Sequence, residues 1–159
     1  DPERVFVMGH SAGGQLAALI SVDPTYLGRR ALRPTDIAGA ILLDGAAYAA
    51  REQNRFLQAF PRTAQFFRAL FGDDLAAYTP ADRVRADVDT PPMLLLYASD
   101  RDYAHTQNMA LSRALRAAGK AHALYPDRDA THVSMASEFG ANRDRMGRRA
   151  AAFIASGRL

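Results

Sequence analysis

The 159-residue chain contains no cysteine and no tryptophan, and Lys120 is its only lysine among 20 basic residues. Without cysteine, a disulfide framework, a thiolate metal site and a cysteine nucleophile are all excluded, and the compartment stays open. No apolar run approaches the roughly 18 residues that span a bilayer, so no membrane-spanning segment is expected. No basic segment followed by an apolar one opens the sequence, as it would in a signal peptide.

What the chain does contain is typical of one globular domain over residues 1–159. Hydrophobic residues make up 48% and charged residues 23%, which excludes a disordered or collagen-like chain. The net charge is only +3, and the basic residues are not gathered with aromatic ones as in proteins that bind nucleic acids. We therefore expect no nucleic-acid partner.

The beginning of the sequence is unusual. Residue 1 is aspartate rather than methionine, and a strand pattern starts almost at once at Val5. We therefore expect the sequence to be a piece of a longer protein. Any targeting signal or catalytic part encoded upstream would lie outside it.

Strand and helix patterns alternate along the chain. Apolar, partly β-branched runs predict four strands, and runs of helix-forming residues predict helices between them and after the last one. Such alternation is typical of an α/β fold with a mostly parallel sheet and helices on both faces. The expected strands are Arg4–Met8, Asp36–Leu43, Met93–Tyr97 and Ala121–Tyr125, and the expected helices are Gln15–Val22, Thr106–Ala118 and Asp144–Ile154.

Residues 46–89 form a long insert between the second and third expected strands. Phe56 and Phe60, and likewise Phe67 and Phe71, are spaced four residues apart, which predicts two short helices separated at Pro61. Two interpretations stay open. The helices pack their apolar faces on the body of the domain, or they form a lid over a pocket for an acyl or aryl group.

The pentapeptide at residues 9–13, GHSAG, matches the nucleophile-elbow pattern G-x-S-x-G and lies between an expected strand and an expected helix. A serine at such a tight turn is pushed out of the sheet, and we expect Gly9 and Gly13 to be required because side chains there would collide. The Ala12 N–H, at the start of the helix, points where an oxyanion would form. Ser11 is therefore the candidate nucleophile and Ala12 the candidate oxyanion donor.

A serine nucleophile needs a histidine base, and the base needs a carboxylate to fix its tautomer. Among the four histidines, His132 is expected in a loop after the last strand, at the carboxyl edge of the sheet. His10 is expected to point away from Ser11, His122 to lie inside a strand, and His105 to precede or begin a helix. His132 is therefore the candidate base.

Three aspartates follow strands that end near this edge. Asp100 and Asp102 come after the third strand, and Asp44 comes after the second. Asp100 is favoured because it lies near the end of its strand, whereas Asp102 belongs to the turn into the helix. Asp44 stays an alternative, since an acid on the preceding strand can also reach His132. An aspartate that does not face His132 is expected to cap a helix.

These segments together resemble the esterase and lipase group of the α/β-hydrolase fold, including carboxylesterases, feruloyl-esterase-like and kynurenine formamidase-like members. The run GHSAGGQLAAL at residues 9–19 is similar to their elbow. The segment from Pro92 to Asp100, with Gln107 seven residues further on, is similar to their acid segment. The segment from Tyr125 to His132 is similar to their histidine segment. The resemblance supports Asp100, because the acid of the family stands seven residues before that glutamine.

The resemblance implies a serine hydrolase that cleaves a small-molecule carboxylic ester through an acyl-enzyme, with no cofactor and no metal. The alternatives are an aryl formamidase-type amide hydrolase and an inactive fragment or binding module. In the family, roughly the first half of the sheet precedes the elbow, and so does an H-G-G-type loop that supplies a further oxyanion donor. This sequence contains neither. We therefore expect the chain to be the C-terminal part of the fold and weakly active by itself.

Overall fold

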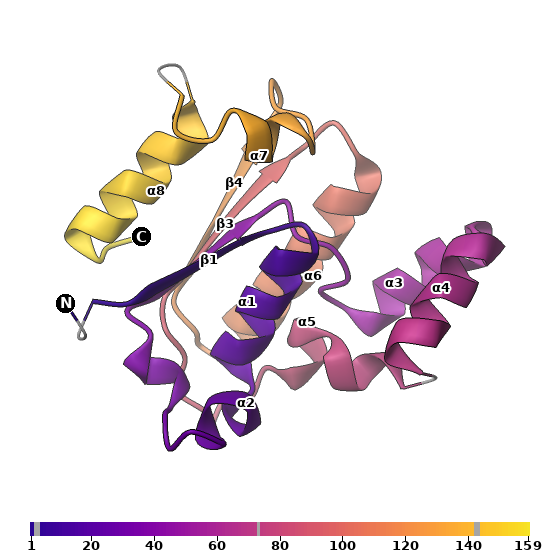
Figure 1. Ribbon diagram of the computed structural model, residues 1–159, viewed down its shortest axis with the longest axis horizontal. Coiled ribbons are helices and arrows are strands. Elements are labelled where there is room, and N and C mark those ends of the chain that lie inside the picture. The colour runs from indigo at the N-terminus through magenta and orange to yellow at the C-terminus, as the bar shows by residue number, and fades with distance from the viewer. Residues whose placement is uncertain (2–3, 73, 142–143) are drawn as a thin grey trace.

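The protein is described by a computed structural model that covers residues 1, 4–72, 74–141 and 144–159. Its centre is a sheet of four parallel strands in the order β1-β2-β3-β4 (Figure 1). Met8 of β1 pairs with Ile41 of β2, and Ile41 in turn pairs with Leu94 of β3. The predicted parallel α/β fold is confirmed. The strands are β1 (Phe6–His10), β2 (Gly39–Leu43), β3 (Met93–Ala98) and β4 (His122–Asp127).

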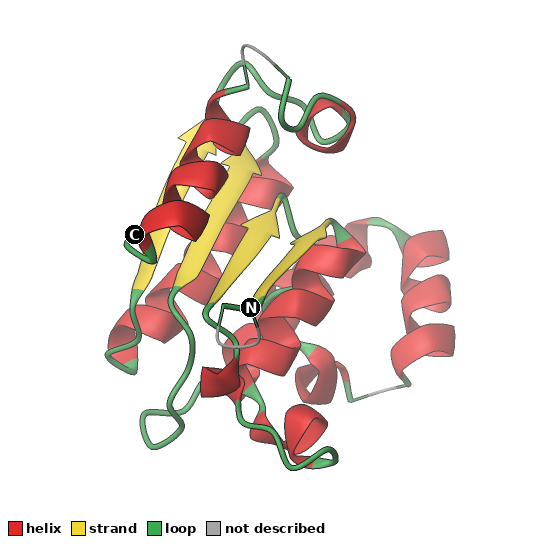
Figure 2. Ribbon diagram, turned by 60° about the vertical axis from the view of Figure 1, so that its left-hand side comes forward, coloured by secondary structure: helices red, strands yellow, loops and turns green. Residues whose placement is uncertain are grey.

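Helices cover both faces of the sheet, as Figure 2 shows. Side chains of a strand alternate between faces, so Ala40 and Leu42 point to one face and Ile41 and Leu43 to the other. The first face packs on α1 (Ala12–Val22) and α6 (Asp102–Ala117), and the second packs on α8 (Arg145–Ser156) through Phe153. All residues of β2 and β3 are buried, as expected for strands covered on both faces.

Several boundaries differ from the sequence prediction. The first helix begins at Ala12 rather than Gln15, and β4 continues through Pro126 to Asp127. Pro126 fits because β4 is the last strand of the sheet, where a missing N–H need not break a ladder. Short helical segments occupy the connections: α2 (Pro24–Gly28), η1 (Pro34–Asp36) and α7 (Ser134–Ser137).

The insert contains the two predicted short helices, followed by two shorter segments: α3 (Ala50–Ala59), α4 (Pro61–Phe71), η2 (Leu75–Tyr78) and α5 (Pro80–Arg83). The rings of Phe56 and Phe60 lie 4.7 Å apart between centroids, and those of Phe67 and Phe71 lie 5.6 Å apart. α3 and α4 project to the side of the domain in Figure 1 and share a small apolar cluster around Leu57. α3 meets the domain body at α6, where Phe56 contacts Tyr103. That α3 and α4 act as a lid stays a prediction.

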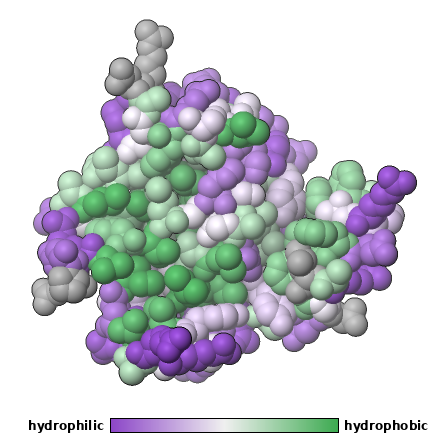
Figure 3. Space-filling view, viewed as in Figure 1, coloured by the Kyte–Doolittle hydropathy of each residue, from purple (hydrophilic) through white to green (hydrophobic). Residues whose placement is uncertain are grey.

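The outer edge of β1 is apolar and open. Val5 and Met8 keep 49% and 51% of their surface exposed, and Leu16 of α1 keeps 58%. Figure 3 shows hydrophobic surface over the region where β1 and α1 face the viewer. Among the described helices, none has the length and apolar character that crossing a bilayer demands.

Candidate active site

Ser11 lies in the sharp turn between β1 and α1. Its φ of 55° and ψ of −119° fall in a region that residues other than glycine rarely occupy, and such strain gathers at functional sites. The turn is fixed on both sides, because the Ser11 N–H donates to the Leu43 carbonyl at 3.0 Å and the Ser11 carbonyl accepts from the Gln15 N–H at 3.2 Å. The sequence motif therefore adopts the strand-turn-helix geometry expected of a nucleophile elbow.

The two glycines of the motif are not equivalent. A Cβ atom on Gly9 would lie 2.1 Å from the Gly13 carbonyl oxygen, which no side chain tolerates. A Cβ atom on Gly13 would meet nothing within 4 Å among the described residues. The steric expectation is confirmed for Gly9 and is wrong for Gly13, because the crowding comes from the backbone of α1 folding back over β1.

Ala12 is the first residue of α1. The first N–H groups of a helix have no acceptor within the helix, and the helix dipole makes this end favourable for negative charge. The Ala12 N–H is thus available next to Ser11. Its role as oxyanion donor stays a prediction.

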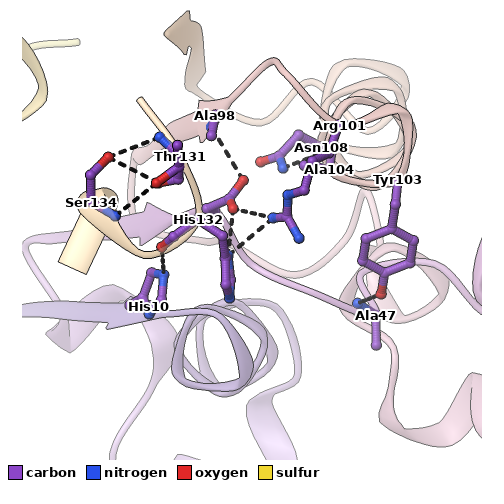
Figure 4. A network of polar contacts seen from close by, with 11 residues as sticks. His10, Ala47, Ala98, Arg101, Tyr103, Ala104, Asn108, Thr131, His132 and Ser134 are labelled. Carbon is purple, nitrogen blue, oxygen red and sulfur yellow. Dashed lines mark hydrogen bonds and ion pairs between the residues drawn. The ribbon is translucent and has the colours of Figure 1, made fainter. Parts of the chain in front are cut away.

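His132 contacts a carboxylate through its Nδ1 atom. Asp44 Oδ2 lies 2.5 Å from His132 Nδ1. Figure 4 marks the contacts of the His132 ring with dashed lines. Asp44 follows β2, is 1% exposed, and accepts a hydrogen bond from the Ala98 N–H to Oδ1 at 3.2 Å. A buried aspartate on Nδ1 leaves Nε2 as the nitrogen able to take up a proton.

The prediction that Asp100 faces His132 is corrected by this contact. Asp100 is exposed in the turn after β3, and Asp102 begins α6; within the described residues, neither contacts His132. The register explains the difference. The Asp44 N–H donates to the Leu96 carbonyl, so Asp44 lies level with the last residues of β3, whereas Asp100 lies two residues beyond the end of that strand.

Arg101 is a site residue that the sequence analysis did not identify. Its guanidinium forms an ion pair with Asp44 Oδ2 and also lies 3.0 Å from His132 Nδ1. Its side chain is 38% exposed. The sequence signal was its place directly after the favoured acid, at the carboxyl edge of the sheet.

His10 also belongs to the site, contrary to the expectation that it points elsewhere. Its Nε2 lies 2.8 Å from the His132 carbonyl oxygen and donates a hydrogen bond to it, and the two rings lie 4.5 Å apart between centroids. The residue next to Ser11 therefore holds the backbone of the His132 loop. Among the described residues, no hydrogen bond joins the Ser11 hydroxyl itself to His132.

The other two histidines are engaged away from this contact. His105 lies in the first turn of α6, and its Nδ1 contacts the Tyr97 hydroxyl at 2.9 Å. His122 lies in β4 as expected and contacts the Ser112 hydroxyl at 2.8 Å.

A buried polar network holds the loop that follows Asp44. The Tyr103 hydroxyl accepts a hydrogen bond from the Ala47 N–H at 3.0 Å and donates one to Gln53 Oε1 at 2.6 Å. Burial raises the pKa of the Tyr103 hydroxyl, so the group stays protonated and can donate. Gln107 accepts from the Ala49 N–H at 3.0 Å. The network joins the loop, α3 and α6.

Comparison with known proteins agrees with the fold. A family model described as alpha/beta hydrolase fold matches residues 1–136. The chain belongs to the α/β-hydrolase fold family. A search of curated proteins finds no match.

Solved structures of esterases share the fold of this α/β-hydrolase chain. Thermogutta terrifontis esterase 2, phosphoramylated by tabun, is 22% identical with a TM-score of 0.70, covering 98% of this chain and 55% of its own. An inhibited esterase B from Lactobacillus rhamnosis is 16% identical with a TM-score of 0.75, covering 99% and 54%. An acetyl ester-xyloside bifunctional hydrolase from Caldicellulosiruptor lactoaceticus is 20% identical with a TM-score of 0.65, covering 99% and 58%. The chain thus spans about half the length of these proteins.

Proposed function

We propose that this α/β-hydrolase chain carries the catalytic residues of a serine hydrolase that cleaves carboxylic esters. The observation that carries the proposal is the contact of 2.5 Å between Oδ2 of the buried Asp44 and Nδ1 of the partly buried His132, at the same sheet edge as Ser11. The acid and the base that we propose for a serine triad are thus in contact. The proposed nucleophile Ser11 lies in a strained turn, and its neighbour His10 holds the His132 loop. The esterase neighbours support ester hydrolysis.

The proposed reaction assigns one role to each group. Ser11 Oγ attacks the ester carbonyl carbon while His132 Nε2 takes its proton, and the Ala12 N–H donates to the oxyanion that forms. Collapse of this intermediate expels the alcohol, which receives the proton from His132, and leaves Ser11 acylated. Water activated by His132 then releases the acid. Asp44 replaces Asp100 as the acid that orients Nδ1. The transfer requires Ser11 to approach Nε2 directly or through one water when substrate binds.

Fluorophosphonate labelling tests the nucleophile, and the tabun adduct of the Thermogutta esterase supports the choice of an organophosphorus probe. We expect mass spectrometry to find the label on Ser11 and to find none in Ser11→Ala. Ser21, whose hydroxyl is bonded to the Ala17 carbonyl inside α1, provides the matched control: Ser21→Ala should label as the native chain does. Labelling that survives Ser11→Ala would refute the proposal.

A substrate panel tests the bond that is cleaved. With one proposed oxyanion donor, turnover of p-nitrophenyl acetate is expected to be slower than that of ordinary esterases by about 10²- to 10³-fold, the cost of losing one donor. N-formylkynurenine is included because the amide alternative uses the same chemistry. Faster turnover of the formamide than of the ester would favour that alternative, and ordinary esterase rates would contradict the single-donor proposal.

A further inference from the structure

Arg101 places a permanent positive charge within the contact between Asp44 and His132. We propose that Arg101 is a positioning residue that shares the Asp44 carboxylate with His132 and thereby limits how readily His132 accepts a proton. This inference rests on the proposed function, because it concerns the base of the proposed triad. The effect of Arg101 on the protonation of His132 can be measured without any substrate.

Three polar atoms lie within contact distance of one another. Asp44 Oδ2, His132 Nδ1 and an Arg101 Nη atom are mutual neighbours, and Figure 4 shows the guanidinium reaching the pair from the connection between β3 and α6. The other carboxylate oxygen, Oδ1, is already engaged by the Ala98 N–H. The two donors therefore share the same oxygen of the buried carboxylate.

Proton placement at Nδ1 follows from this sharing. The nitrogen has one position in the ring plane, which holds either a proton donated to Asp44 or a lone pair that accepts from Arg101. In the first arrangement Nε2 is free to act as the base, and Arg101 binds the carboxylate alone. In the second arrangement Nε2 carries the proton and cannot act as the base. Arg101 thus competes for the arrangement that the proposed reaction uses.

The positive charge of Arg101 also disfavours protonation of His132. Doubly protonated His132 is stabilised by the anionic Asp44 and opposed by the cationic Arg101, and a guanidinium keeps its charge at every pH of interest. The titratable and charged groups shown facing His132 are Asp44 after β2, Arg101 before α6 and His10 at the end of β1. His10 donates to the His132 backbone, so it acts on ring position rather than on Nδ1.

The experiment replaces Arg101 and follows His132 directly. Ring signals of the native chain, Arg101→Gln and Arg101→Lys are titrated by NMR, with His132→Gln used to assign the resonance. We expect the titration midpoint of His132 to lie at higher pH in Arg101→Gln than in the native chain, because the neutral side chain no longer opposes a positive charge on the ring. In Arg101→Lys, which keeps the charge, we expect a midpoint close to the native one. Arg113→Gln is the matched control, since Arg113 is 61% exposed on α6 and pairs with Glu52.

The same variants are labelled with the fluorophosphonate between pH 5 and 9. The labelling rate falls at acid pH as His132 becomes protonated. The pH of this fall should increase in Arg101→Gln by the shift that the titration gives, and it should not change in Arg113→Gln. If Arg101→Gln does not fold, Arg101→Met repeats the neutral substitution, and the lysine variant still tests the charge. An unchanged His132 midpoint in the folded neutral variant would overturn the inference. A shifted midpoint without labelling of Ser11 would instead leave the inference standing and contradict the proposed function.

Discussion

Asp44 leaves β2 with a φ of 43°, another position where a residue other than glycine adopts a positive φ. This conformation turns its carboxylate back over the carboxyl edge of the sheet toward His132 and the Ala98 N–H. A short polar side chain such as aspartate tolerates the left-handed region better than most. The residue type and the turn therefore suit each other.

Exchanging the two candidate acids for amides separates them. Asp44→Asn keeps the shape but favours the wrong tautomer of His132, and the corresponding change in the triad of a serine protease costs about 10⁴-fold in kcat. We expect a loss of that order in Ser11 labelling rate or ester turnover. Asp100→Asn alters an exposed side chain, and its effect should stay within about twofold. The reverse ranking of the two variants would restore Asp100 as the acid.

The sequence predicted Ser11 and His132 as site residues because each belongs to a motif or loop whose position along the chain has a direct structural meaning. The acid could not be predicted in the same way. Asp44 and Asp100 both follow strands, and only the register between β2 and β3 and the path of the turn decide which carboxylate reaches His132. Arg101 and His10 were missed for the same reason, since their roles depend on contacts between distant segments.

At the scale of elements, the elbow depends on how closely the start of α1 lies over the end of β1. The backbone of Gly13 and Gly14 occupies the space that a side chain on Gly9 would need. The motif alone predicted this close approach. It did not predict that the space beside Gly13 is open.

The two glycines give a matched pair of variants. Gly9→Ala forces backbone atoms apart, and overpacking of this kind typically costs about 1–3 kcal/mol. In a domain of this size that loss lowers Tm by about 2–4 °C per kcal/mol. Thermal unfolding should show this decrease, together with loss of Ser11 labelling. Gly13→Ala should retain labelling and should not lower Tm, because alanine is a better helix former than glycine by up to about 1 kcal/mol and the site beside Gly13 is open. Equal losses in both variants would show that the crowding is not specific to Gly9.

For the whole molecule, the order of strands and helices was predictable because hydrophobic periodicity and turn residues are local signals. β2 and β3 are continuous apolar runs, as buried parallel strands require. The sequence pattern of β1 is equally apolar, yet its outer edge is exposed, because strand periodicity does not report which strand has a neighbour on each side.

The open edge of β1 predicts self-association of the isolated chain. Unpaired strand edges with apolar side chains template pairing with other chains, and a lysine there suppresses it. We expect Met8→Lys to reduce the apparent mass seen by sedimentation at high protein concentration, while the free energy of unfolding changes by less than about 0.5 kcal/mol. Leu32→Lys, which changes a similarly exposed residue in the loop after α2, should have no such effect. A concentration-independent monomeric mass for the native chain would contradict the prediction.

Each strand delivers one residue of the polar cluster at its carboxyl end: His10 from β1, Asp44 from β2, Arg101 from the segment after β3, and His132 from the loop after β4. Ser11 directly follows His10 in the turn after β1. The strands follow the chain order within the sheet, and the loop after β4 brings His132 back to Asp44 and His10. A proteolytic cut within the insert would leave Ser11 and Asp44 on one polypeptide and Arg101 and His132 on another. The backbone hydrogen bonds between β2 and β3 would still hold the two polypeptides together. Nicking there should consequently spare the assembly of the cluster, whereas removal of the residues after β4 would abolish it.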